Sequence, residues 1–229
     1  MLSRIPEPEL MNDPVEARAY NDMDHAAVNT AFVNDLLASG LLASGPVDEE
    51  ADTSFILDVG TGTALIPIEL CRRFQNCQVI AQDGAVCMLD IARINVAIGL
   101  CEHRIQLQHG DGKQLEYSDD LFDGVMSNSW LHHLSDPAQG MSEMLRVCKP
   151  GGWLFTRDLF RPETEQELER LVQIHAATET VENQQLLRQS LRAALTLAEA
   201  RQMIGALGLP SEAVQPTSDR HWTLVARKI

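Results

Sequence analysis

The stretch Ile56-Leu57-Asp58-Val59-Gly60-Thr61-Gly62-Thr63-Ala64 decides how this chain folds. Its first residues are typical of a buried strand, its glycines of a tight turn, and the residues that follow of a helix. Glycines at such a turn let a ligand approach the backbone closely, and the first amides of the helix face that ligand. The stretch therefore predicts a strand–turn–helix unit that places a ligand at the turn.

Strands and helices alternate along the chain around this turn. Strands are expected where short apolar runs occur, at 55–59, 78–81, 104–107, 122–126 and 153–156. Helices are expected between them, one ending at 73, one over 86–98 and one over 137–148. Short strands separated by helices indicate a parallel sheet joined by right-handed crossovers. A last strand, 222–226, is expected at the far side of the sheet.

Helical segments flank this alternating region. One helix is expected from Asp13, which can cap its first turn, to near Gly40. After Pro162 two or three helices follow in succession, and the last of them stops at Gly208. We therefore expect one domain made of an N-terminal helical cap at 1–45, a core at 54–158, a helical lid at 162–210 and a closing strand at 220–229.

The composition limits the partners and the compartment. The chain has 229 residues, a formal net charge of -15 at pH 7 and a pI of about 4.8. An acidic surface repels phosphate backbones and anionic lipid headgroups, so nucleic acid and membrane insertion are not expected. The five cysteines include no C-x-x-C pair, which is typical of reduced thiols. Since we find no signal peptide and no apolar run that could span a bilayer, the sequence predicts a cytoplasmic protein.

Asp58 stands two residues before the first glycine of the turn, where its charge restricts the ligand. A carboxylate at this place would repel the phosphates of a nucleotide. It suits a ligand that has a positive charge or an amine in need of an acceptor, and S-adenosylmethionine (SAM) has both a sulfonium and an ammonium group. The alternative is that Asp58 caps the turn and that the glycines only make the turn tight.

Two further acids follow the next two strands. Asp83, at the end of the second strand, can accept hydrogen bonds from both hydroxyls of a ribose, or it can cap the helix that begins near Ala85. Asp111, in Gly110-Asp111-Gly112 after the third strand, can accept the exocyclic amine of adenine, or it can form an ordinary Asp-Gly turn. Together with Asp58, these acids favour a positively charged ligand that contains adenosine.

The order of these motifs resembles that of the class I SAM-dependent methyltransferases, and in particular their ubiquinone- and menaquinone-methylating branch. Two positions depart from the family pattern: Ala64 stands where a third glycine is common, and Gly84 stands where a polar residue often follows the ribose-binding acid. The resemblance covers about 54–158 and the closing strand, and it rests on Asp58-x-Gly60-x-Gly62, on 79–83 with 88–93, on 110–112, on 122–125 with 131–134, and on 145–152.

The resemblance implies a Rossmann-like three-layer sandwich with a mostly parallel seven-stranded sheet, an N-terminal helical cap and a helical insertion after the fifth strand. It implies SAM as cofactor, S-adenosylhomocysteine (SAH) as product and in-line methyl transfer to a small molecule. The alternatives are another enzyme of this fold, such as an aminopropyl transferase or a decarboxylase, and a SAM-binding regulatory protein without turnover. The cofactor-binding residues that the resemblance implies are Tyr20, Asp58, Gly60, Thr61, Gly62, Asp83, Gly84, Met88, Asp111, Gly112 and Asn128.

Candidates for contact with the methyl acceptor follow the fourth and fifth strands. His132 and His133 are the candidate catalytic residues, because histidine is the natural base near neutral pH; a structural role is the alternative for each. Arg157 and Asp158 end the fifth strand and are expected to bind the substrate. We expect no metal ion, and we expect the protein to act as a monomer or a homodimer.

Overall fold

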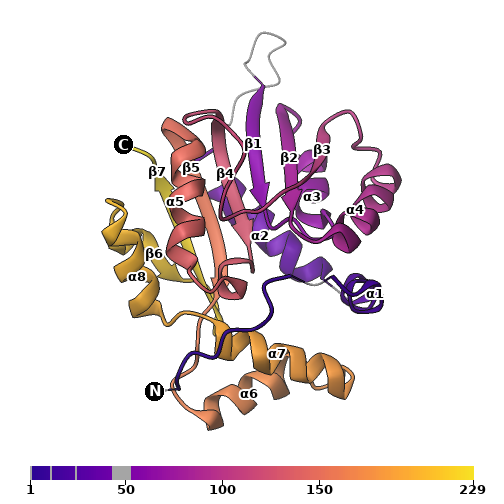
Figure 1. Ribbon diagram of the computed structural model, residues 1–229, viewed down its shortest axis with the longest axis vertical. Coiled ribbons are helices and arrows are strands. Elements are labelled where there is room, and N and C mark those ends of the chain that lie inside the picture. Colours follow the sequence, from indigo (N-terminus) through magenta and orange to yellow (C-terminus); the bar gives the residue numbers. More distant parts are fainter. Residues whose placement is uncertain (1, 11, 24, 43–52) are drawn as a thin grey trace.

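The computed structural model describes residues 2–10, 12–23, 25–42 and 53–229, so the last residues of the expected cap, 43–45, lie outside it. The centre of the fold is one sheet of β1 (Ser54–Val59), β2 (Cys77–Asp83), β3 (Ile105–His109), β4 (Phe122–Asn128), β5 (Cys148–Leu159), β6 (Val214–Pro216) and β7 (His221–Arg227). The strand order is β3-β2-β1-β4-β5-β7-β6 (Figure 1). Strands β1 to β5 pair in parallel, and β7 and β6 are antiparallel additions. The expected mostly parallel, seven-stranded sheet is confirmed.

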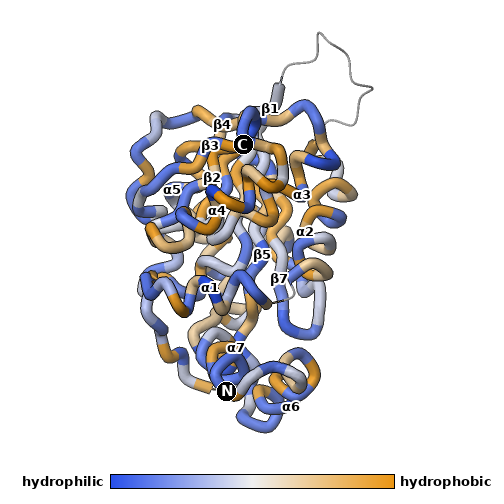
Figure 2. The backbone as a smooth tube through the Cα atoms, turned by 90° about the vertical axis from the view of Figure 1, so that its right-hand side faces the viewer, coloured by the Kyte–Doolittle hydropathy of each residue, from blue (hydrophilic) through white to orange (hydrophobic). Residues whose placement is uncertain are grey.

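Helices cover both faces of this sheet and complete three layers. One face carries α2 (Ala26–Ala38), α3 (Leu65–Arg73) and α4 (Val86–Ile98), and the other carries α5 (Pro137–Val147) and α8 (Leu197–Ala206). Successive residues of a strand point to opposite faces. Ile56 accordingly packs in one cluster with Phe32, whereas Leu57 packs in the other with Met141. Figure 2 shows the hydrophobic residues concentrated on the strands and on the helices that cover them.

Three more helices lie beyond the carboxyl ends of the strands. α6 (Glu165–His175) and α7 (Val181–Ala193) pack on each other around Leu168, Leu171 and Leu191 (Figure 1). α1 (Pro14–Asp22) packs on α4 through Ala17 and Met88. Of the helices in the described residues, none is long and apolar enough to cross a membrane.

The N-terminal helix that was expected from Asp13 to near Gly40 is two helices, α1 and α2. Nε2 of His25 lies 2.7 Å from the carbonyl oxygen of Tyr20, and Met23 is extended, with φ −67° and ψ 148°. The imidazole of His25 therefore hydrogen-bonds to the carbonyl of Tyr20, which in a continuous helix would accept from the amide of the next turn.

The far edge of the sheet also differs from the expectation. The closing strand β7 pairs with β5 on one side and with β6 on the other, so that β6 forms the edge. β6 has only three residues, Val214–Pro216, which is too short to show an alternating pattern. Pro216 suits an edge position, because it has no amide to donate to a further strand.

Gly124 of β4 lies directly under the indole of Trp153 of β5. A Cβ atom at this glycine would lie 1.9 Å from Cε2 of Trp153, so the ring or the strand would have to move. We expect Gly124→Ala to lower the free energy of unfolding by roughly 1–3 kcal/mol, as overpacking of a core does. Urea denaturation measures the change. Gly205→Ala in α8 is the matched control and should be neutral or stabilising, because its Cβ would meet only Ser211 at 3.9 Å; equal effects of the two variants would contradict the packing argument.

The strand order changes direction between β1 and β4, because the chain builds outward from β1 to β2 and β3 on one side and to β4 and β5 on the other. In open α/β sheets, ligands bind outside the carboxyl ends of the strands at such a point. The glycine turn follows β1 at this place, with α6 and α7 facing it (Figure 1).

Candidate functional site

The glycine turn is held against the end of β2. The amide of Gly60 donates to the carbonyl of Gln82 at 2.9 Å, and the amide of Gly62 donates to Oδ2 of Asp83 at 2.7 Å. Gly60 and Gly62 have φ of 72° and 56°, in the left-handed region that favours glycine. Ala64, where the related family often has glycine, also has a positive φ of 60°. Hydrogen bonds from its own amides to the end of β2 therefore fix the shape of the turn, with one strained non-glycine residue at its end.

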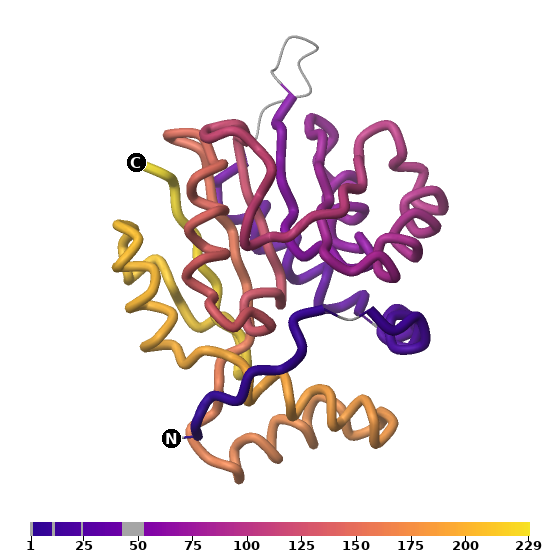
Figure 3. Tube along the Cα trace, in the orientation of Figure 1, coloured from indigo at the N-terminus to yellow at the C-terminus, as the bar shows by residue number. Residues whose placement is uncertain are grey.

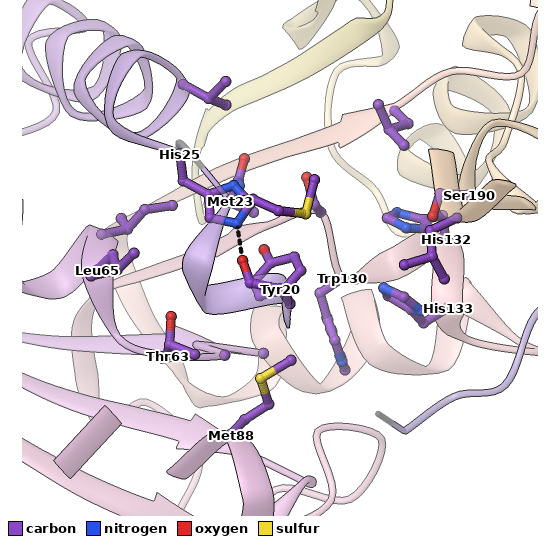
Figure 4. Close-up of a pocket in the computed structure, with 18 of the residues that line it drawn as sticks. Tyr20, Met23, His25, Thr63, Leu65, Met88, Trp130, His132, His133 and Ser190 are labelled. Atoms are coloured by element: carbon purple, nitrogen blue, oxygen red, sulfur yellow. Dashed lines mark hydrogen bonds between the residues drawn. The ribbon is translucent and has the colours of Figure 1, made fainter. Parts of the chain in front are cut away.

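A cavity of about 350 Å³ runs from this turn to the lid (Figure 4). Its turn end is lined by Asp58, Gly60, Thr61, Gly62, Asp83, Gly84, Met88 and Asn128. Its lid end is lined by His132, His133, His175, Leu187, Ser190, Arg220 and His221. Small-molecule sites in proteins have volumes of roughly 300–1,000 Å³, so the cavity can hold a ligand of that size.

Two neighbouring carboxylates, the buried Asp58 and the half-buried Asp83, repel each other at the turn end. Asp58 is 3% exposed, and its pKa is raised to about 7, mainly by burial and further by the negative charge of Asp83. Burial also raises the pKa of Asp83, although the amides of Ala85 and Gly62 oppose that change. Neighbouring buried carboxylates are costly unless a positive charge or hydrogen-bond donors accompany them. The turn end therefore favours a cationic ligand with donor groups over a phosphate.

Two further observations at the turn end, both within the described part of the chain, are a buried acceptor without a hydrogen-bond partner and open space beside Gly62. Oδ1 of Asn128, at the end of β4, is buried and has no hydrogen-bond partner among the described residues. No described heavy atom lies within 4 Å of the position that a Cβ of Gly62 would take. Buried acceptors in native proteins are normally satisfied, so the Asn128 oxygen calls for a donor from a bound molecule.

The two histidines at the lid end have opposite charge preferences. Nδ1 of His132 lies 2.5 Å from Oδ1 of Asp158, and its Nε2 lies 3.3 Å from Oε1 of Glu7. Although burial opposes the charged form, the carboxylates of Asp158 and Glu7 raise the pKa of His132 to about 9. Burial, followed by the positive charge of His132, lowers the pKa of His133 to about 4. At neutral pH His133 is the one of the two that can accept a proton.

Comparison with known proteins identifies the core of the chain. A sequence profile described as a methyltransferase domain matches residues 56–152. This segment, which is less than half of the chain, belongs to the methyltransferase domain family. The matched segment contains the glycine turn, Asp83 and the two histidines of the cavity. The family that the sequence motifs predicted is therefore confirmed.

Curated relatives and a solved structure agree with this assignment. Demethylmenaquinone methyltransferase of Deinococcus radiodurans is 37% identical over 99 residues, which are 43% of this chain and 40% of that protein. The same-named protein of Desulfitobacterium hafniense is 33% identical over 108 residues, 47% of this chain and 43% of that protein. The matches thus span about two fifths of those relatives. The structure of a SAM-dependent methyltransferase from Aquifex aeolicus covers 95% of this chain and 99% of its own with a TM-score of 0.68 and 17% identity, which shows the same fold.

Most residues that the methyltransferase motifs implied for the cofactor are brought together at the cavity. The expected residues that line it are Tyr20, Asp58, Gly60, Thr61, Gly62, Asp83, Gly84, Met88 and Asn128. Tyr20 comes from α1, and its ring packs on that of His25 with 4.5 Å between centroids (Figure 4). α1 therefore brings the far N-terminal part of the chain to the turn end of the cavity.

Asp111 and Gly112 are not among the described residues that line the cavity, and their expected contact with adenine stays a prediction. The carboxylate of Asp111 is 55% exposed and accepts from the amide of Lys113 at 2.9 Å and from its ammonium at 3.1 Å. Gly112 is needed for packing, because a Cβ there would lie 2.4 Å from the ring of Trp130. The local Asp-Gly turn, which was the alternative for this motif, is what the structure contains.

Trp130 is a site residue that the motifs did not reveal. Its ring lines the cavity and lies against Gly60 and Gly112, where a Cβ would approach it to 2.5 and 2.4 Å (Figure 4). The glycines of two separate motifs thus make room for one indole. Its place directly before the Leu131–His133 turn is the signal that could have indicated it.

Arg157 and Asp158 are not among the described residues that line the cavity, and their expected substrate contacts stay a prediction. Adjacent strand residues point to opposite faces. The guanidinium of Arg157 donates to Thr223 at 3.0 Å and pairs with Asp35, on the α2 face of the sheet. Asp158 points to the other face, where it holds His132. It is a positioning residue for that histidine.

The N-terminal strap, residues 2–10, runs from the α6–α7 pair toward α1 and was not anticipated (Figure 3). Arg4 donates to the carbonyls of Ala193 and Leu134 at 2.6 Å each, which joins α7 to the turn after β4. Glu7 and Leu10 of the strap line the cavity. The strap therefore closes the space between the lid and the sheet and contributes side chains to the site.

We expect Arg4→Ala to loosen the strap. The variant loses hydrogen bonds from a charged donor to buried carbonyls, each of which contributes about 1.5–3 kcal/mol. The amide of Ile5, which donates to the carbonyl of Arg192 at 3.1 Å, should then exchange with solvent deuterium about tenfold faster or more. Arg170→Ala, which removes an exposed pair with Glu167, is the control. Unchanged exchange at Ile5 in the Arg4 variant would show that other contacts hold the strap.

Proposed function

We propose that this protein transfers a methyl group from SAM to a small-molecule acceptor. The observation that carries the proposal is a pair of neighbouring carboxylates, the buried Asp58 and the half-buried Asp83, beside the glycine turn that lines the cavity in a methyltransferase domain. The sulfonium and ammonium of SAM supply positive charge, and its ribose and amine supply donors for these oxygens. A phosphate ligand would meet repulsion at the same place.

Five residues that line the cavity near the glycine turn have a proposed part in holding SAM. Asp83 accepts the two ribose hydroxyls, Asp58 pairs with the ammonium, and Asn128 offers its unsatisfied oxygen to the same amino-acid part of the ligand. Tyr20 and Met88 cover the ligand from the side of α1 and α4. SAM supplies a methyl group on a positively charged sulfur. The acceptor atom attacks the methyl carbon in line with the carbon–sulfur bond, and SAH leaves with the electron pair of that bond. The protein's contribution is to align the two molecules and exclude water.

A small acceptor is favoured by the enclosure of the lid end. The N-terminal strap and α7 line the lid end opposite His132 and His133, through Glu7 and Ser190, so an acceptor would lie between these walls. The curated relatives are named for menaquinone precursors, which agrees with a ring-shaped, partly apolar acceptor. His133 is the proposed general base for an acceptor that must lose a proton.

Calorimetric titration of the purified protein with SAM, SAH, decarboxylated SAM and NAD tests the cofactor. We expect SAM and SAH to bind and the other two to bind much more weakly. Formation of SAH with a panel of quinols, phenols, amines and carboxylic acids tests turnover. Preference for decarboxylated SAM would favour an aminopropyl transferase, tight SAM binding without SAH formation would favour a regulatory protein, and absence of SAM and SAH binding would overturn the proposal.

A further inference from the structure

Three potential metal ligands converge at the lid end of the cavity. Oε1 of Glu7 lies 3.3 Å from Nε2 of His132 and 3.1 Å from Nδ1 of His133, and the three atoms all lie within 4.8 Å of one another. A metal ion with bonds of about 2.1 Å separates neighbouring ligand atoms by roughly 3.0 Å in an octahedral site and roughly 3.4 Å in a tetrahedral site. The two distances from Glu7 fall between these values.

Hydrogen bonds from a second layer of residues orient two of these ligands. Asp158 holds Nδ1 of His132 at 2.5 Å, and is itself fixed by the amide of Leu159 at 2.7 Å. The hydroxyl of Ser190 on α7 donates to Oε1 of Glu7 at 3.2 Å. Histidine ligands of metals usually donate their other nitrogen to a carboxylate in this way, which fixes the ring and strengthens the ligand. Asp158, which the turn end does not use, has a role in this arrangement.

The three ligands leave room for others. Glu7 and His132 are nearly buried, with side chains 9% and 3% exposed, whereas His133 is 28% exposed, and all three line the cavity. Figure 4 shows the two histidines side by side near Ser190. Two imidazoles and one carboxylate on one side of an ion leave its remaining positions open toward the cavity. This ligand set is typical of divalent transition metals such as Zn²⁺, Mn²⁺, Fe²⁺ and Co²⁺.

We propose that Glu7, His132 and His133 bind a divalent transition-metal ion whose open positions face the methyl acceptor. The proposal rests on the proposed function only in assigning the lid end to the acceptor. It replaces the expectation of no metal, and with the ion bound it also replaces the general-base role of His133, because a metal-bound imidazole has no free lone pair to accept a proton. An acceptor with an oxygen donor, such as a phenol, an enol or a carboxylic acid, would bind the ion through that oxygen. The N-terminal strap would then supply a ligand to the site that it covers, so metal binding would also hold the strap closed.

Metal titration of the EDTA-treated full chain tests the site. We expect one equivalent of Zn²⁺ to bind with a dissociation constant in the micromolar range or below, and Co²⁺ to give the visible absorption bands of a nitrogen- and oxygen-ligated ion. Glu7→Gln and His133→Ala should each weaken Zn²⁺ binding at least tenfold, and Asp158→Asn should weaken it about tenfold or more. His175→Gln, which removes a cavity histidine paired with Asp219, should leave the affinity unchanged.

Two further measurements make each outcome decisive. Histidine NMR signals of the wild-type chain should shift on Zn²⁺ addition for His132 and His133 and not for His175 or His221, which tests the site even if a variant fails to fold. SAH binding is measured on the metal-free protein. If SAH binds but no stoichiometric metal binding is found, the metal site alone is overturned. If neither SAH nor the metal ion binds, the proposed function is overturned as well. Equal Zn²⁺ affinity in wild type and variants would show that the ion binds elsewhere, which would also overturn the metal site.

Discussion

Replacement of Asp83 by alanine is expected to weaken SAM binding at least 100-fold. In the proposed complex the Asp83 carboxylate accepts both ribose hydroxyls, and a hydrogen bond to a charged group contributes about 1.5–3 kcal/mol. Two such bonds correspond to about 3 kcal/mol or more, which is over 100-fold in the dissociation constant. Calorimetry with SAH, which has the same ribose, measures the loss.

The controls for this variant separate ligand contact from support of the turn. Asp83 also accepts from the amides of Gly62 at 2.7 Å and Ala85 at 2.8 Å, so the thermal midpoint must be measured alongside the affinity. Asp83→Asn keeps one acceptor oxygen and should stay folded while still losing tenfold or more in affinity. Asp90→Ala, which removes an exposed partner of Arg93 on α4, should bind SAH normally. A dissociation constant of Asp83→Ala within threefold of wild type would contradict the ribose assignment.

The affinity for SAM is expected to fall about tenfold for each pH unit below 7. Burial, with the added charge of Asp83, raises the pKa of Asp58 to about 7, and only the ionised carboxylate pairs with the ammonium of SAM. Above pH 7 the carboxylate is already ionised, so affinity no longer rises there, and it falls again where the amine of SAM loses its own proton. Below pH 7 binding must first remove a proton. Calorimetry with SAM between about pH 5.5 and 8.5 gives the profile.

Asp58→Asn separates this titration from that of other groups. At pH 8 the variant should bind SAM at least 30-fold more weakly, because removal of one partner of a buried charge pair costs about 2–5 kcal/mol. The affinity of the variant for SAM should not change with pH below pH 7. In the ligand-free protein the raised pKa of Asp58 has a consequence for folding stability. The neutral carboxyl is the form that the fold favours, so its contribution to stability is lost as pH rises through about 7. The variant, which stays neutral, should therefore have a higher thermal midpoint than wild type at pH 8. A profile as steep as that of wild type would assign the titration to another group.

The parts of the fold that followed from the sequence are those with repeated local signals. Apolar runs with turn residues located β1 to β5 and β7, because each is buried and follows a helix or turn. The division between α1 and α2 depends on one imidazole reaching the carbonyl of Tyr20, which no periodicity reports. β6 exists because β7 offers an edge to pair with, which is a property of the folded sheet.

The residues of the site also fall into those that local sequence signals could predict and those whose position depends on the folded structure. Asp58 and Asp83 were predictable because a strand end beside a glycine turn leaves few places for a carboxylate to point. Which side of β5 carries Arg157 and which carries Asp158 needed the register of the sheet. Glu7 reaches the histidines because the strap is tied down by residues far apart in the chain, among them Arg4 and Ile5, which bond to α7.

The position of Trp130 gives the molecule a built-in optical reporter. Of the three tryptophans, Trp153 and Trp222 are core residues with 3% and 0% exposure, whereas the indole of Trp130 borders the cavity beside the glycine turn. The emission of an indole responds to a charge or an aromatic ring that arrives next to it. A variant with phenylalanine at positions 153 and 222 would leave one fluorophore, with which ligand arrival and departure could be timed by stopped-flow mixing without any label.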